Sequence, residues 1–172
     1  LPARFVVGDA DGVALLFAET GGAGPERPRS VGGQVSPLVG RERELALLMS
    51  LREECLREGV ARAALVVGGC GTGKTRLARE FLSLAGELPG NIIRCTGTLV
   101  RPEADFALLA PLLAAAGIPT AGREAAQVRR DFAQWLRGMC PGGAPIVVSE
   151  DLQWADAASV QVMDEVLGLL SD

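Results

Sequence analysis

The segment GGCGTGKT, residues 68–75, constrains the fold of this chain more than any other feature. It satisfies the pattern G-x-x-x-x-G-K-[ST], in which glycines let the backbone curl around a phosphate and point successive N–H groups at it. The apolar run AALVVGG precedes the segment and indicates a buried strand, whereas TRLAREFLSLA follows it and indicates a helix that stops at Gly86. A strand, a glycine-rich loop and a helix in this order predict a phosphate-binding P-loop.

Lys74 is the only lysine among the 17 basic residues of the chain. A GC-rich coding genome would explain arginine elsewhere, but it does not explain a lysine at the position where a slim ammonium must enter between phosphates. We expect Lys74 to reach the β- and γ-phosphates and the Thr75 hydroxyl to bind Mg²⁺. The candidate nucleotide-binding residues of this segment are Gly68, Gly69, Cys70, Gly71, Thr72, Gly73, Lys74, Thr75 and Arg76.

The composition excludes several other kinds of chemistry. The chain has no His and no Tyr, which removes histidine acid–base catalysis, Ser-His-Asp triads and histidine-ligated zinc. Its four cysteines lack CxxC spacing, so we expect reduced thiols in a cytoplasmic protein. The net charge of -4 argues against nucleic-acid contact by this segment. No signal peptide and no apolar run long enough for a membrane span is present.

A second acidic site follows the apolar run PIVVSED at 145–151. A P-loop needs a carboxylate at the end of a nearby strand to hold the Mg²⁺ shell and orient the attacking water. Glu150 and Asp151 are the candidates for both catalysis and metal binding. Because successive side chains of an extended strand point to opposite sides, both acids cannot face the metal from one extended backbone. We assign the metal to Glu150 and the water to Asp151, with the reverse assignment left open.

Helices and strands alternate along the rest of the chain. Helices are predicted over 41–58, 106–116 and 123–137, and another starts after Asp156, a good N-cap. Apolar residues at helical spacing in the first helix, Leu47, Leu48, Leu51 and Cys55, predict an amphipathic face. With strands at 63–69, 91–95 and 145–151, this pattern predicts a parallel-sheet P-loop NTPase with three αβα layers.

The N-terminal part has a different composition. Residues 4–18 contain two apolar runs around Gly-Asp-Ala-Asp-Gly and predict a β-hairpin, and we interpret residues 1–19 as the tail of a preceding domain. Residues 20–37 are rich in Gly, Pro and Ser and predict a flexible linker. Residues 38–172 then form the P-loop ATPase domain.

Three landmarks together resemble a known family. LVGRERELALL at 38–48, the P-loop, and EDLQWADAAS at 150–159 are similar to the Orc1-like AAA module of the signalling STAND ATPases, which occurs in LuxR-type transcriptional regulators and beside kinase or cyclase domains. The resemblance implies that Val39, Gly40 and Arg41 lie near the adenine. It also implies an ATP- and Mg²⁺-dependent regulatory ATPase that hydrolyses ATP slowly when complete. The family usually has Asp-Asp at 150–151 and often His where this chain has Gln153.

The resemblance further implies that the P-loop strand lies between the second acidic strand and a later sensor strand that this sequence lacks. We therefore expect an N-terminal portion of an ATPase core, with the P-loop strand left as an exposed apolar edge. Partners would be ATP, attached effector or sensor domains outside these residues, and a homo-oligomer formed on activation. Alternative functions are an ATP-loaded switch or scaffold without turnover, and a small-molecule phosphotransferase.

For two residues of the signature, structural roles are the favoured interpretation. Trp154 is expected to pack against the sheet, and Asp156 is expected to cap the last helix rather than to take part in catalysis. Arg94, after the second strand, is expected to be a solvated surface residue.

Overall fold

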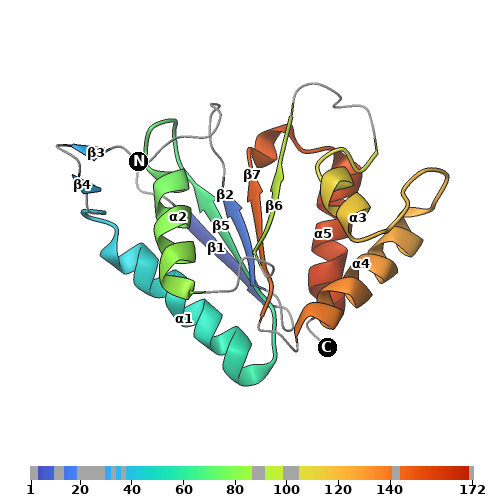
Figure 1. Cartoon of the computed structure of the whole chain (residues 1–172), viewed down its shortest axis with the longest axis horizontal. Helices are drawn as coiled ribbons and strands as arrows, with labels where there is room; N and C mark the ends of the chain where they lie inside the picture. The colour runs from blue at the N-terminus through green and yellow to red at the C-terminus, as the bar shows by residue number, and fades with distance from the viewer. Residues whose placement is uncertain are drawn as a thin grey trace.

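A five-stranded sheet forms the centre of the molecule, with helices on both of its faces (Figure 1). The strand order is β1-β5-β2-β7-β6, and all neighbours are parallel except β1 and β5. This computed structural model describes residues 4–9, 14–18, 30–31, 34–35, 38–86, 92–98, 105–140 and 144–170. Its elements are β1 (Arg4–Asp9), β2 (Ala14–Ala18), β3 (Ser30–Val31), β4 (Gln34–Val35), α1 (Glu42–Glu58), β5 (Arg62–Val67), α2 (Lys74–Ala85), β6 (Ile92–Thr96), α3 (Ala110–Ala115), α4 (Ala125–Met139), β7 (Ile146–Glu150), the 3-10 turn η3 (Leu152–Trp154) and α5 (Ala157–Leu169).

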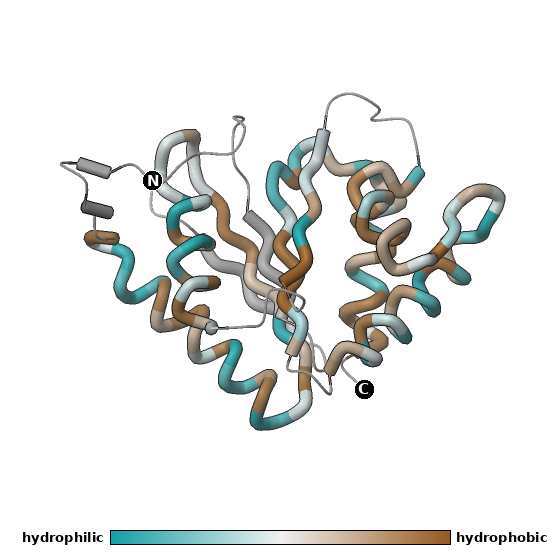
Figure 2. The backbone as a smooth tube through the Cα atoms, viewed as in Figure 1, coloured by the Kyte–Doolittle hydropathy of each residue, from teal (hydrophilic) through white to brown (hydrophobic). Residues whose placement is uncertain are grey.

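Two apolar cores lie on opposite faces of this sheet. Helices α1 and α2 pack over alternate strand residues such as Val66, Ile146 and Val148. Helices α3, α4 and α5 pack over the other face, which presents Cys95 and Val147. Figure 2 shows hydrophobic residues along β5 and β7 and at intervals along the helices. The predicted three-layer αβα fold is therefore confirmed.

Most predicted elements occur within a few residues of their expected bounds. Helix α1 ends at Gly59, whose φ of 69° needs the conformational freedom of glycine. Leu48, Leu51 and Cys55 are buried as its pattern predicts, but Leu47 is 38% exposed because it lies at the rim of the buried stripe. Helix α3 starts four residues later than expected, because the chain first makes a turn through Phe106, a buried residue with a φ of 63°.

The predicted N-terminal hairpin is wrong in its pairing. Strands β1 and β2 both form, but they pair with opposite edges of β5 rather than with each other. An apolar central strand has N–H and C=O groups on both edges that need partners, and the two N-terminal strands satisfy them. Of the predicted linker, β3 and β4 pair as a short antiparallel ribbon, and the remaining residues of 20–37 lie outside the described residues.

The expected exposed edge at the P-loop strand is also absent from the described sheet. Strand β5 has β1 on one side and β2 on the other, so the edges of the sheet are β1 and β6. Strand β2 also separates β5 from the acidic strand β7. The prediction that the acidic strand lies directly beside the P-loop strand is therefore wrong, because β2 fills that place.

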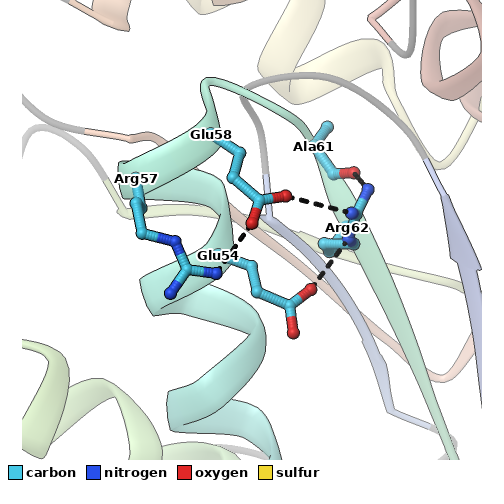
Figure 3. Close-up of polar contacts among 5 residues, drawn as sticks. All are labelled: Glu54, Arg57, Glu58, Ala61 and Arg62. Atoms are coloured by element: carbon cyan, nitrogen blue, oxygen red, sulfur yellow. Dashed lines mark hydrogen bonds and ion pairs between the residues drawn. The ribbon is translucent and has the colours of Figure 1, made fainter.

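An ion-pair cluster fastens α1 to the start of β5, at the end of the sheet opposite the P-loop (Figures 1 and 3). Arg62 donates from Nε to Glu54 Oε2 at 3.1 Å and lies 3.8 Å from Glu58. It also donates to the carbonyl of Ala61. The Arg62 side chain is 16% exposed, whereas that of Arg57, which pairs with Glu58, is 71% exposed. The half-buried Arg62 is therefore the member that contributes to stability.

Replacing Arg62 with Met is expected to lower the free energy of unfolding by about 1–2 kcal/mol, because a charge-assisted hydrogen bond is lost while most of the aliphatic stem remains. Urea unfolding followed by circular dichroism measures this change. Arg57→Met is the matched control and should leave the midpoint unchanged. Equal midpoints for the Arg62→Met protein and the unmodified protein would contradict a stabilising role for the cluster.

Candidate nucleotide-binding site

The loop between β5 and α2 has the backbone that a phosphate-binding loop requires. Gly71 and Gly73 have φ values of 75° and 87°, a region that side chains disfavour. A Cβ on Gly68 would lie 2.8 Å from Thr72 Oγ1, so the loop closes tightly over its own first residue. Thr72 holds this shape, because its hydroxyl donates to the Gly69 carbonyl at 2.8 Å. Gly71 and Gly73 are thus required by their conformation, and a side chain at Gly68 would displace the Thr72 hydroxyl.

Lys74 lies at the centre of this loop. Its side chain extends back along the loop, and Nζ donates to the carbonyls of Gly68 at 2.6 Å and Gly69 at 2.9 Å. The residue is only 6% exposed, which is rare for lysine. Burial of an ammonium is costly unless charge-assisted hydrogen bonds compensate for the lost water. The loop therefore holds a positive charge in place beside the carbonyls of Gly68 and Gly69.

The N-terminus of α2 adds to this positive potential. Lys74 is its first residue, Thr75 and Arg76 follow, and the first turn contains no acidic residue. The unpaired N–H groups at a helix start favour an anion there. Arg76 lies 3.6 Å from Glu80 one turn further on, which directs at least part of its charge along the helix. The half-buried Thr75 is the residue of this turn that carries a hydroxyl suited to Mg²⁺.

Arg41 connects the segment before α1 to the loop. One of its terminal nitrogens donates to the Thr72 carbonyl at 3.0 Å, and the other donates to Glu44 Oε1 at 2.7 Å. The hydrogen bond from Arg41 lowers the pKa of Glu44. Gly40 has a φ of 74°, and Val39 is 79% exposed beside it. The structure thus brings Arg41 to the loop, and it adds Glu44, which sequence reasoning missed.

The two acids of the second motif lie at the same end of the sheet as the P-loop, where β5 and β7 end (Figure 1). Val66 of β5 and Glu150 of β7 both pair with Ala18 of β2, which places their Cα atoms about 10 Å apart, or two strand spacings. The Glu150 side chain is 26% exposed and lies 4.0 Å from Arg94. Arg94 is 50% exposed, which confirms the expected surface position.

Asp151 departs from the extended backbone that sequence reasoning assumed. It has a φ of 54° and a ψ of 42°, a left-handed conformation that is uncommon for a residue other than glycine. Alternation along an extended strand therefore does not govern how its side chain points relative to that of Glu150. Gln153 donates to Asp151 Oδ1 at 3.2 Å, and the turn continues into η3.

Asp156 has a larger role than the predicted helix cap. It does cap α5, because Oδ1 accepts from the Ser159 amide at 2.8 Å. It also accepts from the amides of Phe106 at 2.9 Å and Leu108 at 3.0 Å and from the Ser159 hydroxyl. Burial raises the pKa of this carboxyl, but the hydrogen bonds from Leu108, Ser159 and Phe106 outweigh it and leave the pKa lowered. Asp156 therefore joins the chain that follows β6 to the chain that follows β7.

The expected packing of Trp154 is wrong, whereas the expected free cysteines are confirmed. Trp154 is 44% exposed, so the interpretation that it packs against the sheet is wrong: η3 holds it at the surface. The four cysteines are all free, as the spacing predicts. None of the described helices is long and apolar enough to cross a membrane.

The residues at this end of the sheet fit a triphosphate with Mg²⁺. The loop offers a buried ammonium, a helix start without acidic residues, and two glycines with a positive φ that side chains disfavour. In the described part of the chain, no group of three or more acidic or cysteine side chains converges into a metal site of its own.

The fold and the loop define a P-loop nucleotide-binding protein. A family model described as the AAA ATPase domain matches residues 37–172, and the chain belongs to this family. Membership implies an ATPase module that binds nucleotide. Comparison with curated proteins and with solved structures gave no significant match.

Proposed function

We propose that this chain binds ATP with Mg²⁺ and hydrolyses it slowly, as the regulatory module of a bacterial signalling or transcription-regulatory protein. The observation that carries the proposal is the buried Lys74 ammonium, held by the carbonyls of Gly68 and Gly69 within a loop whose Gly71 and Gly73 have a positive φ. The signalling context rests on the resemblance of the segments 38–48 and 150–159 to STAND ATPases.

Each residue of the site has a proposed role. Lys74 and the loop amides would bind the β- and γ-phosphates and neutralise the charge that develops during transfer. Thr75 and Glu150 would hold Mg²⁺, which when bound screens the phosphate charge. Asp151 would orient water for in-line attack. Because its backbone is left-handed, the alternation of an extended strand does not force its side chain to point away from that of Glu150. Arg41 would fix the loop through Thr72.

A second candidate function is an ATP-loaded switch without turnover. Both acids already have partners in the protein, since Arg94 faces Glu150 and Gln153 donates to Asp151. These contacts would compete with water positioning. A single-turnover assay distinguishes the two functions: release of phosphate from bound ATP supports the ATPase, and bound ATP that stays intact supports the switch.

Replacing both acids, Glu150→Gln with Asp151→Asn, is expected to lower the hydrolysis rate about 100-fold or more, because positioned carboxylates typically contribute 10²–10⁴ to such steps. Phosphate release under saturating ATP measures the rate. The matched control is Glu53→Gln with Asp164→Asn, two exposed acids on α1 and α5 that change the net charge equally. Retained turnover in the Glu150/Asp151 variant would rule out the assignment of these acids.

A further inference from the structure

The connection that leaves β6 touches the acidic turn at its first residue, Gly97. Gly97 is buried and follows Thr96, which pairs with Glu150 in the parallel register. The Gly97 amide donates to the Glu150 carbonyl at 2.9 Å. This hydrogen bond lies beyond the last paired residue of β6, so the contact between the two strands extends to the point where the acids leave the sheet.

Gly97 also packs against the backbone of the acidic turn. A Cβ at this position would lie 2.2 Å from the Asp151 carbonyl oxygen, and 3.1 Å from the carbonyl carbons of Asp151 and Trp154. Real Cβ atoms essentially never approach another atom so closely. All three neighbours are backbone atoms, so rotation of a side chain cannot relieve the contact. Space, rather than an unusual φ, is therefore what requires glycine at position 97.

The carbonyl that Gly97 contacts also closes the turn. Asp151 O accepts from the Trp154 amide at 2.9 Å, and this bond defines η3. Asp151 itself is in the left-handed conformation, which depends on its surroundings because L-residues disfavour it. A shift of this carbonyl would therefore rotate the peptide plane that follows Asp151. A displaced Gly97 would also disturb its hydrogen bond to the Glu150 carbonyl, so both acidic side chains would be redirected.

The far end of the same turn is fixed as well. Asp156 accepts hydrogen bonds from the amides of Phe106 and Leu108, which belong to the same connection between β6 and α3. The turn from Asp151 to Asp156 is thus held at both ends by the chain that follows β6. A side chain at Gly97 would press on one end of the turn while Asp156 holds the other end, so we expect the displacement to occur at Asp151.

We propose that Gly97 is a positioning residue for the acidic motif: its missing side chain lets the β6 connection hold Glu150 and Asp151 in the geometry that Mg²⁺ and the attacking water require. This role rests on the proposed function, because it acts through the two acids. Gly97 lies outside the P-loop, so it should affect metal-dependent events without affecting how the loop binds phosphate.

The test compares Gly97→Ala with Gly138→Ala. Gly138 lies in α4, and an added Cβ there meets nothing within 4 Å, so this variant controls for the extra methyl group. ATP affinity is measured by calorimetry on the whole chain, once with excess Mg²⁺ and once with EDTA. In the unmodified protein Mg²⁺ should strengthen ATP binding. Gly97→Ala should keep the affinity seen in EDTA but weaken the apparent Mg²⁺ affinity about tenfold or more, the range found when groups that orient metal ligands are altered. Gly138→Ala should match the unmodified protein.

The outcomes separate the two proposals. Failure of the unmodified protein to bind ATP would overturn the proposed function. ATP binding that ignores Mg²⁺ would overturn the acid assignment and with it the role of Gly97. A normal Mg²⁺ response in Gly97→Ala would overturn the role of Gly97 alone.

A measurement on the unmodified protein covers the case in which Gly97→Ala does not fold. Addition of ATP with Mg²⁺ should slow hydrogen exchange at the Gly97 amide together with the Trp154 amide, because both hydrogen bonds stabilise the same turn. Protection at Trp154 without protection at Gly97 would show that the turn is ordered independently of Gly97, and it would overturn the proposal.

Discussion

Lys74→Ala should weaken ATP·Mg²⁺ binding by about 100-fold or more, which corresponds to about 2.8 kcal/mol of binding free energy. The substitution removes the buried ammonium that donates to the Gly68 and Gly69 carbonyls. Without it, these carbonyls lose the cation that compensates them, and a triphosphate in the loop loses the positive charge closest to its β- and γ-phosphates. Isothermal calorimetry measures the change directly.

Two further variants sharpen this prediction. Arg79→Ala removes one positive charge from the same helix and should leave ATP affinity within about twofold, because salt in the solvent screens the attraction between a charge outside the loop and the phosphates. Lys74→Arg keeps the charge but should still weaken binding, because a broad guanidinium does not fit where a slim ammonium does. Equal affinities of Lys74→Ala and the unmodified protein for ATP·Mg²⁺ would contradict the proposed role of Lys74.

Asp156→Ala should lower the free energy of unfolding by about 3 kcal/mol. The substitution deletes the acceptor for the Phe106 and Leu108 amides, and an unsatisfied buried donor costs about 1–3 kcal/mol. It also removes the cap of α5, worth about 1 kcal/mol. Chemical unfolding measures the loss, and Asp164→Ala, at an exposed acid of the same helix, is the control. A loss no larger than that of the control would contradict the conclusion that Asp156 joins the chain after β6 to the chain after β7.

The same carboxyl predicts a pH dependence with a defined sign. Because the pKa of Asp156 is lowered in the folded protein, its contribution is fully present above the unfolded value of about 3.9 and is lost as the pH falls through the folded value. Asp156→Asn lacks this titration. The difference in unfolding free energy between the unmodified protein and Asp156→Asn should therefore shrink as the pH is lowered from about 6 to about 3. A difference that stays constant would exclude a charged Asp156 as its source.

The local parts of the site could be predicted from sequence because their signals are local. The P-loop pattern fixes the residue types that a phosphate-binding turn needs, and the structure gives Gly71 and Gly73 the expected positive φ. Helices α1 and α2 end just before Gly59 and Gly86, as predicted, and Asp156 acts as the predicted cap of α5. Each of these features depends on a few consecutive residues, whose propensities and hydrogen bonds act in the same direction.

The arrangement of distant segments could not be predicted in the same way. Which strand lies beside β5 depends on pairing between segments far apart in the chain, and the apolar runs at β1 and β2 carry no signal of their partner. The left-handed turn at Asp151 and the hydrogen bond from the Phe106 amide to Asp156 arise from tertiary contacts. Gly97 did leave a faint signal, because an isolated glycine at the end of a strand often marks a close backbone approach.

The most direct test of the central claim is a calorimetric titration of the chain with ATP, ADP and AMP in the presence of Mg²⁺. If the loop at 68–75 binds the β- and γ-phosphates, ATP will bind at one saturable site and AMP will bind far more weakly, because it lacks both phosphates that Lys74 contacts. If ATP and AMP bind with equal affinity, or if ATP does not saturate the protein, the loop is not the nucleotide-binding site that its geometry indicates.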